Sequence, residues 1–290
     1  MARKTTTSKT TTPFDAFKAH VGRFAQRHPF RSGVKEVIDD LVQITFNLLS
    51  QVLPVIYTFD GSVRFDSRLV VELEDYRDHP AAWAELAELG SEYMWLVATA
   101  VPFADLLTDL YGVSIAKEQI QTKGQYMTSP PVADTAVHDL DGTKEEDRPL
   151  RVGDPTCGSG ALLLAVLRDR FTTLGKDGVA KTSVFGNDID PAMVKLATVQ
   201  IGLSSYVHNV PLGCLMMHCA DVIKDYNSPG TRMVTIHPSV EKSRTNGFWE
   251  DGEQVEEKVA IEVPPVVRVI VTLLAVEMKA SAGRSEACEA

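Results

Sequence analysis

The sequence predicts a doubly wound α/β domain with a mostly parallel sheet, preceded by a helical N-terminal domain. Two observations predict this fold. After about residue 150, short apolar runs alternate with helical stretches, as in parallel strands joined by helices. Before residue 120, apolar residues recur at three- and four-residue steps, the spacing of a buried helix face. The predicted domains are a disordered basic tail over 1–12, a helical domain over 13–120 and the α/β domain over 121–290.

The composition is that of a globular protein without a membrane span. Hydrophobic residues make up 44% and charged residues 23% of the 290, which excludes a disordered chain and a disulfide scaffold. The four cysteines are irregularly spaced, so we expect reduced thiols. No apolar run reaches the roughly 18–20 residues of a membrane helix, and no apolar core follows the basic N-terminus. These features predict a cytoplasmic protein.

The charge is unevenly distributed. Lys and Arg number 29 against 39 Asp and Glu, a net charge of −10. The first 35 residues nevertheless carry eight basic residues and a single acidic one, Asp15. A basic arm on an acidic body could contact a polyanion, and a solvated tail would account for the same residues equally well.

The N-terminal half shows helix start and stop signals. Ser32 is a candidate N-cap and Pro54 a candidate stop, and Pro102 would interrupt a later helix. The predicted order is a helical segment over 13–55, a short hairpin within 56–78 and a helical segment over 80–112.

The second half shows β-α-β-α-β alternation, which predicts helices on both faces of a parallel sheet. The predicted strands are 150–152, 183–185, 214–219, 233–236 and 266–276, with helices over 161–171 and 192–203.

The segment DPTCGSG (154–160) lies between the first of these strands and the following helix. Its glycines allow positive φ and a close approach of the backbone to a ligand. The helix that follows offers unpaired N–H groups, and ligands of open parallel sheets bind at the carboxyl ends of the strands. We therefore expect a ligand loop, against the alternative of a tight turn without a ligand.

Acidic residues follow the next two strands. Asp188 is placed to take the ribose hydroxyls of a nucleoside cofactor, while Asp190 before Pro191 has the position of a helix N-cap. Asp221, after the third strand, could accept a hydrogen bond from the exocyclic amine of an adenine ring or cap a helix.

These motifs resemble those of S-adenosylmethionine-dependent DNA adenine methyltransferases. DPTCGSG is similar to the D-P-x-C-G-[ST]-G loop of type I restriction-modification methylation subunits. GQYMTSPPV (124–132) resembles their G-Q-F-[FY]-T-P-x-x-V segment, with Ser129 where proline is usual, and GNDIDPAMVKLA (186–197) resembles their next conserved stretch. The resemblance implies a Rossmann-like class I methyltransferase domain that binds S-adenosylmethionine. The cofactor residues that it implies are Gly124, Tyr126, Thr128, Asp154, Pro155, Cys157, Gly158, Gly160, Asp188 and Asp221.

The sequence departs from the family at the catalytic motif. The family carries [NDS]-P-P-[YFW] after its fourth strand, where the aromatic ring stacks on the flipped adenine. Here His237-Pro238-Ser239-Val240 follows the corresponding strand, so His237 and Pro238 occupy the catalytic position without an aromatic residue. Val240 cannot supply the stacking ring.

The resemblance implies a DNA adenine N6-methyltransferase of the restriction-modification type. The alternative is a catalytically inactive relative that keeps the cofactor pocket and acts as a DNA-binding or partner subunit. DNA is the expected partner, together with a separate specificity subunit or a second copy of the chain. We expect no metal, because in a strand over 214–219 Cys214 and His218 would face one side and Cys219 the other.

Overall fold

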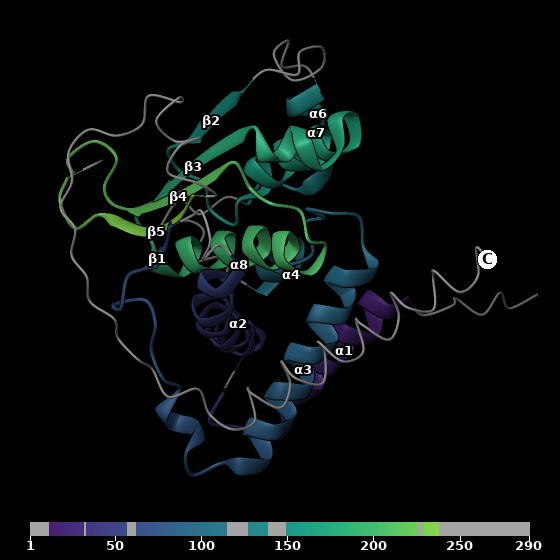
Figure 1. Cartoon of the computed structure of the whole chain (residues 1–290). Coiled ribbons are helices and arrows are strands. Elements are labelled where there is room, and N and C mark those ends of the chain that lie inside the picture. The colour runs from purple at the N-terminus through teal and green to yellow at the C-terminus, as the bar shows by residue number, and fades with distance from the viewer. Residues whose placement is uncertain are drawn as a thin grey trace, which may run out of the picture.

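The computed structural model describes residues 12–31, 33–56, 62–114, 127–138, 149–225 and 228–237 (Figure 1). The predicted tail before Thr12, the predicted cap Ser32 and the predicted strand over 266–276 lie outside this part of the chain.

The N-terminal part is helical, as predicted. Thr12 caps the first helix by accepting a hydrogen bond from the backbone N–H of Asp15, and the second helix ends two residues after Pro54. The helical region predicted over 80–112 is interrupted after Thr99. The helices are α1 (Pro13–Arg27), α2 (Val34–Ile56), α3 (Pro80–Thr99) and α4 (Thr108–Ser114), with a 3-10 turn at Glu74–Tyr76.

The hairpin predicted within 56–78 is wrong. Its first half forms β1 (Ser62–Phe65), which pairs antiparallel with β5 (Arg232–His237). Val63 lies opposite Ile236 and Phe65 opposite Val234, so the strand joins the main sheet. The alternating apolar residues indicated a strand correctly, but its partner is the distant β5, and the described residues 66–78 contain no strand.

The sheet has five strands in the order β1-β5-β4-β3-β2. The other three strands, β2 (Leu150–Asp154), β3 (Thr182–Asp188) and β4 (Cys214–Cys219), are parallel to one another, as the alternation predicted. β5, however, runs antiparallel to β4, with Leu215 opposite Ile236. The fold is a mixed α/β fold, and only the part formed by β2, β3 and β4 is parallel.

The described helices cover one face of this sheet. Val184, Leu215 and Val234 share that face by register and are fully buried. α7 (Ala161–Ala180) contacts β2 and β3, and α8 (Pro191–Val207) contacts β3 and β4. Both connections step along the sheet in the same direction, so right-handed crossovers put both helices on the same side. The expected second helical layer of a doubly wound fold is not seen among the described residues.

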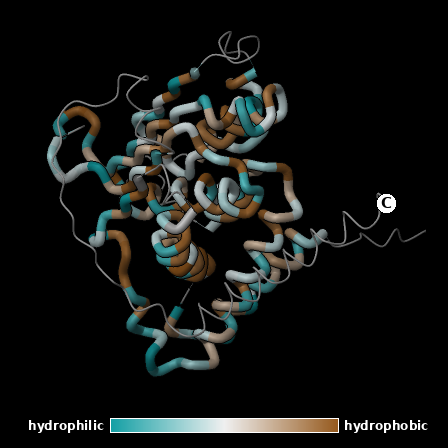
Figure 2. The backbone as a smooth tube through the Cα atoms, viewed as in Figure 1, coloured by the Kyte–Doolittle hydropathy of each residue, from teal (hydrophilic) through white to brown (hydrophobic). Residues whose placement is uncertain are grey.

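A further helical layer completes this side. α2 packs on β1 through the edge-to-face contact of Phe46 and Phe65 and also contacts α8. α1 and α3 lie beyond α2, and α6 (Pro130–His138) packs on α7 (Figure 1). Figure 2 shows how hydrophobic α2 is along its length. One hydrophobic core runs from Phe17 of α1 to Ile236 of β5, so the helical N-terminal part and the sheet share it.

None of the helices in the described part of the chain is long and apolar enough to cross a membrane.

Candidate functional site

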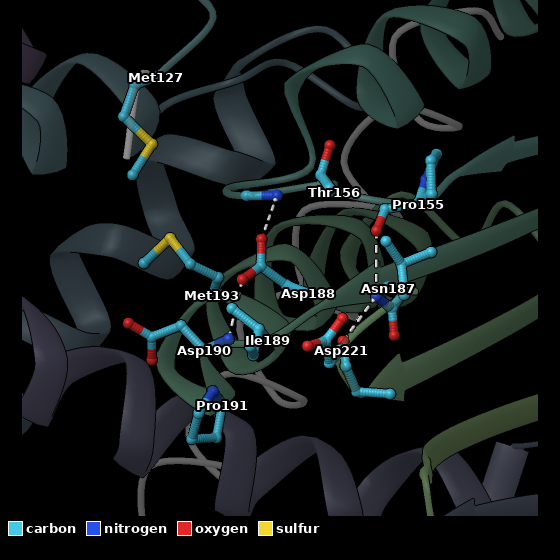
Figure 3. A pocket seen from close by; sticks show the side chains of 13 residues that line it. Met127, Pro155, Thr156, Asn187, Asp188, Ile189, Asp190, Pro191, Met193 and Asp221 are labelled. Carbon is cyan, nitrogen blue, oxygen red and sulfur yellow. Dashed lines mark hydrogen bonds between the residues drawn. The ribbon is translucent and has the colours of Figure 1, made fainter. Parts of the chain in front are cut away.

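The carboxyl ends of β2, β3 and β4 meet at a pocket of about 730 Å³ (Figure 3). This volume lies within the range of small-molecule sites. The three strand ends and the turns after them supply most of its walls. The lining residues are Met127, Pro155, Thr156, Gly158, Asn187, Asp188, Ile189, Asp190, Pro191, Met193, Ala220, Asp221 and Val222.

The loop after β2 is held in a turn by its own backbone and by Asp154. The Asp154 carboxylate accepts a hydrogen bond from Thr156 N at 3.1 Å, and Gly160 N donates to Cys157 O at 2.8 Å. Cys157 N donates to Asn187 O at 2.8 Å, which ties the loop to the end of β3. Asp154 therefore shapes the loop without lining the pocket.

Both glycines of the loop have positive φ, 52° at Gly158 and 85° at Gly160. A Cβ at Gly160 would lie 3.0 Å from the Cβ of Ala197, because the loop packs directly on α8. A Cβ at Gly158 would meet no atom within 4 Å. The backbone of Gly158 thus borders the open pocket, which leaves room for a ligand close to the chain.

Cys157 packs behind the loop. Its Sγ lies 3.2 Å from where a Cβ of Gly186 would be, so Gly186 makes room for it on β3. Burial raises the pKa of the Cys157 thiol, and the nearby carboxylates of Asp188 and Asp154 raise it further. The neutral thiol is therefore a packing group and not a nucleophile.

Asp188 is the centre of the site. Its Oδ2 accepts a hydrogen bond from Gly158 N and its Oδ1 one from Asp190 N, both at 2.9 Å (Figure 3). Burial raises the pKa of Asp188, while these two backbone N–H groups oppose the rise. A carboxylate has about four acceptor positions, so each oxygen keeps one for a ligand.

Two neighbours of Asp188 organise the strand ends. The Nδ2 of Asn187 donates to the carbonyl oxygens of Pro155 and Ala220, both at 3.0 Å, and so links the turns after β2 and β4. The Oδ1 of Asn187 is buried and has no hydrogen-bond partner in the described structure. Asp190 caps α8 by accepting from Ala192 N at 2.9 Å, the N-cap role that its position before Pro191 predicted.

The third strand end brings Asp221 to the same pocket. Its Oδ1 accepts from Ile223 N, and its Oδ2 lies 3.0 Å from the Nζ of Lys224. The Lys224 ammonium, together with the backbone N–H of Ile223, lowers the pKa of Asp221. Asp221 is thus an ionised acceptor, with Val222 beside it in the pocket wall.

The predicted cofactor residues fall into three groups. Pro155, Gly158, Asp188 and Asp221 line the pocket. Asp154, Cys157 and Gly160 shape the loop from behind, and Thr128 follows the lining residue Met127 without lining the pocket itself. The remaining predicted site residues, Gly124, Tyr126 and Pro238, lie outside the described residues.

The structure does not bring His237 to this pocket. β5 is antiparallel to β4, so its end lies beside the start of β4, where His237 Nε2 is 3.9 Å from Cys214 Sγ. The pocket lies at the other end of β4, after Cys219. Five residue steps along a strand separate these ends by about 16 Å. The position of His237 after the fourth predicted strand gave no information on the direction of that strand, and the direction decides which edge of the sheet His237 occupies.

The apolar walls of the pocket were missed by sequence reasoning. Ile189 is 69% exposed directly after Asp188, and Met127 and Met193 line the same space. An apolar residue exposed between Asp188 and the helix cap was a signal, because flat apolar walls next to carboxylates suit a heteroaromatic ring.

The described residues contain no group of three or more His, Cys, Asp or Glu side chains that could hold a metal ion. By register, Cys214 shares a sheet face with His218, and Cys219 belongs to the other face.

The structure is a mixed α/β fold with a glycine loop after one strand and carboxylates at the ends of three neighbouring strands. Comparison with known families agrees: residues 103–235 match the family model described as N-6 DNA Methylase. Residues 103–235 are therefore an N6-adenine DNA methyltransferase-like region of the chain, which confirms the resemblance found in its motifs. Comparisons with curated proteins and with solved structures gave no match.

Proposed function

We propose that the pocket binds S-adenosylmethionine and that the chain is a DNA adenine N6-methyltransferase of the restriction-modification type. The observation that carries the proposal is the convergence of the glycine loop, Asp188 and Asp221 on one pocket. The family match supports DNA methylation at the level of the family.

The charge of the pocket supports this cofactor over a phosphate-bearing one. Its lining includes the three carboxylates of Asp188, Asp190 and Asp221 and, among the described residues, no Lys, Arg or His. S-adenosylmethionine carries a sulfonium, an ammonium and one carboxylate, so its net charge is positive. A dinucleotide would bring its phosphates against these carboxylates, and like charges repel in a partly buried site.

The chemistry of the lining residues suits the different parts of S-adenosylmethionine. The free acceptor positions of Asp188 suit the two ribose hydroxyls, and Asp221 suits the exocyclic amine of the adenine ring. Ile189 and Val222 offer apolar surface for that ring. The open backbone of Gly158 leaves room for the methionine part of the cofactor.

The bound cofactor would supply an activated methyl group for direct transfer to the amine of an adenine. An adenine within a duplex must leave the base stack to reach such a pocket. Reading of a DNA sequence requires contacts to base edges, which we assign to a separate specificity subunit or to a second copy of the chain. The cytoplasm is the compartment in which we expect it to act.

Calorimetric titration tests the cofactor. The purified chain is titrated with S-adenosylmethionine, with S-adenosylhomocysteine, which lacks the sulfonium charge, and with NAD. We expect both adenosyl compounds to bind and NAD to give no heat. NAD binding, or no binding of either adenosyl compound by a folded protein, would overturn the proposal.

A labelled-methyl assay on adenine-containing DNA tests the reaction. Transfer to N6 would establish the enzyme, and cofactor binding without any transfer would favour the inactive relative. The position of His237 at the far edge of the sheet makes this assay necessary, because the described pocket does not include the catalytic position that the resemblance implies.

A further inference from the structure

A short segment from Phe103 to Thr108, the first residue of α4, lies behind the cofactor loop and is fixed to α7 and α8. We name residues 103–108 the brace. Phe103 has a φ of 62° and is fully buried. Its N–H donates to Ser204 Oγ of α8 at 2.6 Å, and its carbonyl accepts from Arg168 Nη1 of α7 at 2.7 Å. A non-glycine residue in this region is strained, so the surrounding structure holds it there.

Gln200 of α8 connects the brace to the cofactor loop. Its Oε1 accepts hydrogen bonds from Leu106 N at 3.1 Å and Leu107 N at 3.0 Å. Its Nε2 donates to the carbonyl oxygen of Ser159 at 3.1 Å. The side chain is only 2% exposed, so water does not compete for these bonds.

Thr108 makes a second, direct connection. Its Oγ1 donates to Ser159 Oγ at 2.7 Å, and the two residues are 0% and 2% exposed. The N–H of Thr108 donates to Asp105 Oδ1 at 3.1 Å, which fixes the start of α4. Ser159 is therefore held through its carbonyl by α8 and through its hydroxyl by the brace.

Ser159 is the residue between the two glycines with positive φ. Gly158 and Gly160 have no side chains to fix the loop, so its conformation depends on what holds the residue between them. The N–H of Gly158 has to point at Asp188 for the pocket to form. Because Thr108 and Gln200 hold Ser159, they set the direction of that N–H from behind.

We propose that Thr108 and Gln200 are positioning residues for the cofactor, acting through Ser159 without touching the pocket. The proposal rests on the proposed cofactor function and extends it: cofactor affinity depends on a segment that precedes the glycine loop by about 50 residues, as the separation of 51 between Thr108 and Ser159 shows. A change in the brace should loosen the loop and weaken binding while the fold stays intact.

A double-mutant cycle on Thr108→Val and Ser159→Ala tests the direct connection. Thr198→Val is the matched control, because its buried hydroxyl donates its hydrogen bond to Val194 O within α8 and not to the loop. We expect Thr108→Val to weaken S-adenosylmethionine binding about five-fold or more, the effect of leaving one buried hydrogen-bonding group unpaired, and the double variant to be no weaker than the worse single one. Thr198→Val should keep its affinity for S-adenosylmethionine.

Hydrogen exchange of the backbone amides of Gly158 and Gly160, without cofactor, gives an independent measurement. We expect Thr108→Val to speed their exchange about five-fold, and Thr198→Val to leave it unchanged relative to the rest of the chain. Equal affinities and equal exchange rates in the two threonine variants would overturn the positioning role. If the wild type binds no cofactor, the proposed function fails, and the exchange rates still decide whether the brace holds the loop.

Discussion

The backbone N–H of Gly158 donates a 2.9 Å hydrogen bond to Oδ2 of Asp188, and this bond joins two motifs that are 30 residues apart in the chain. The glycine loop after β2 and the acidic residue after β3 are therefore one unit. Since β2 and β3 are parallel neighbours, with Asp154 opposite Gly186, their carboxyl ends are brought together by the sheet itself. The carboxylate is oriented before any ligand arrives, which lowers the cost of ordering it on binding.

Replacing Asp188 with Asn should weaken cofactor binding while the protein stays folded. The amide keeps one acceptor oxygen, so one of the two backbone N–H groups loses its partner and one ribose acceptor becomes a donor. We expect affinity for S-adenosylmethionine to fall by a factor of about 10–100, equivalent to roughly 1.4–2.7 kcal/mol, measured by calorimetry.

Asp66→Asn is the control for this variant. Asp66 also accepts a backbone N–H, from Arg68 at 3.0 Å, and it follows β1 at the same edge of the sheet without lining the pocket. Its affinity should equal that of the wild type. Equal losses in both variants would show that the effect comes from the fold and not from the site.

Gly160→Ala should destabilise the protein. A Cβ there lies 3.0 Å from the Cβ of Ala197 and 3.3 Å from its Cα, and φ is 85°. Positive φ and the close contact together cost about 1–3 kcal/mol. Gly153→Ala on β2 is the matched substitution, because Gly153 does not have a positive φ and a Cβ added there would meet no atom within 4 Å. Chemical denaturation should give a lower unfolding free energy for the first variant only, and equal values would contradict the close packing of the loop on α8.

Much of the site was predictable because it is local in the sequence. Strand, glycine turn and helix follow one another over 150–180, and Asp188 and Asp221 each follow a strand. The carboxyl ends of neighbouring parallel strands lie at the same edge of the sheet, so the residues after them come together without any further knowledge of contacts between distant residues. The same holds for the cap role of Asp190, which depends on its own helix alone.

The direction of a strand and contacts between residues distant in the sequence were not predictable from the same patterns. The run 233–236 gives no sign of its direction in the sheet, and only its pairing with β4 and β1 shows that it runs antiparallel to both. The role of Gln200 was also hidden, because a polar residue within an apolar helix gives no sign of its partners. Its three hydrogen bonds go to Leu106, Leu107 and Ser159, distant in the sequence.

Asp105→Asn should stabilise the protein at neutral pH. Burial raises the pKa of Asp105, and its Oδ2 is buried without a hydrogen-bond partner in the described structure. A raised pKa means that the native state binds the proton more tightly, so this group favours folding below its unfolded pKa of about 3.9 and loses that stability as pH rises through its native pKa. Asn keeps an acceptor for the N–H of Thr108 and carries no charge.

Thermal unfolding between pH 4 and pH 8 measures this difference. We expect the stability of the variant to exceed that of the wild type by an amount that grows as pH rises, to about 1 kcal/mol or about 2–4 °C in Tm. The difference in stability should disappear near pH 4. Asp66→Asn should show the opposite trend, because the Arg68 side chain, which donates hydrogen bonds to the Asp66 carboxylate, lowers the pKa of Asp66. A gap that widens toward acid pH would contradict the assignment of a raised pKa to Asp105.

His237→Cys should form a disulfide with Cys214 under mild oxidation. Leu215 lies opposite Ile236, so Cys214 comes opposite position 237, and the present side chains are 3.9 Å apart. Cα atoms of directly opposed antiparallel residues are about 4.5–5.5 Å apart, within the range of disulfides. Thr235→Cys is the control, because Thr235 faces Met216 and has no cysteine opposite.

Mass spectrometry of peptides under non-reducing conditions identifies the bond. A 214–237 bond in the first variant, with none in the second, would establish the antiparallel direction of β5. The cross-linked protein should bind S-adenosylmethionine as tightly as the wild type, because the bond lies about 16 Å from the pocket along β4. Failure of the folded variant to cross-link would contradict this register, and His237 would return as a candidate for the catalytic step.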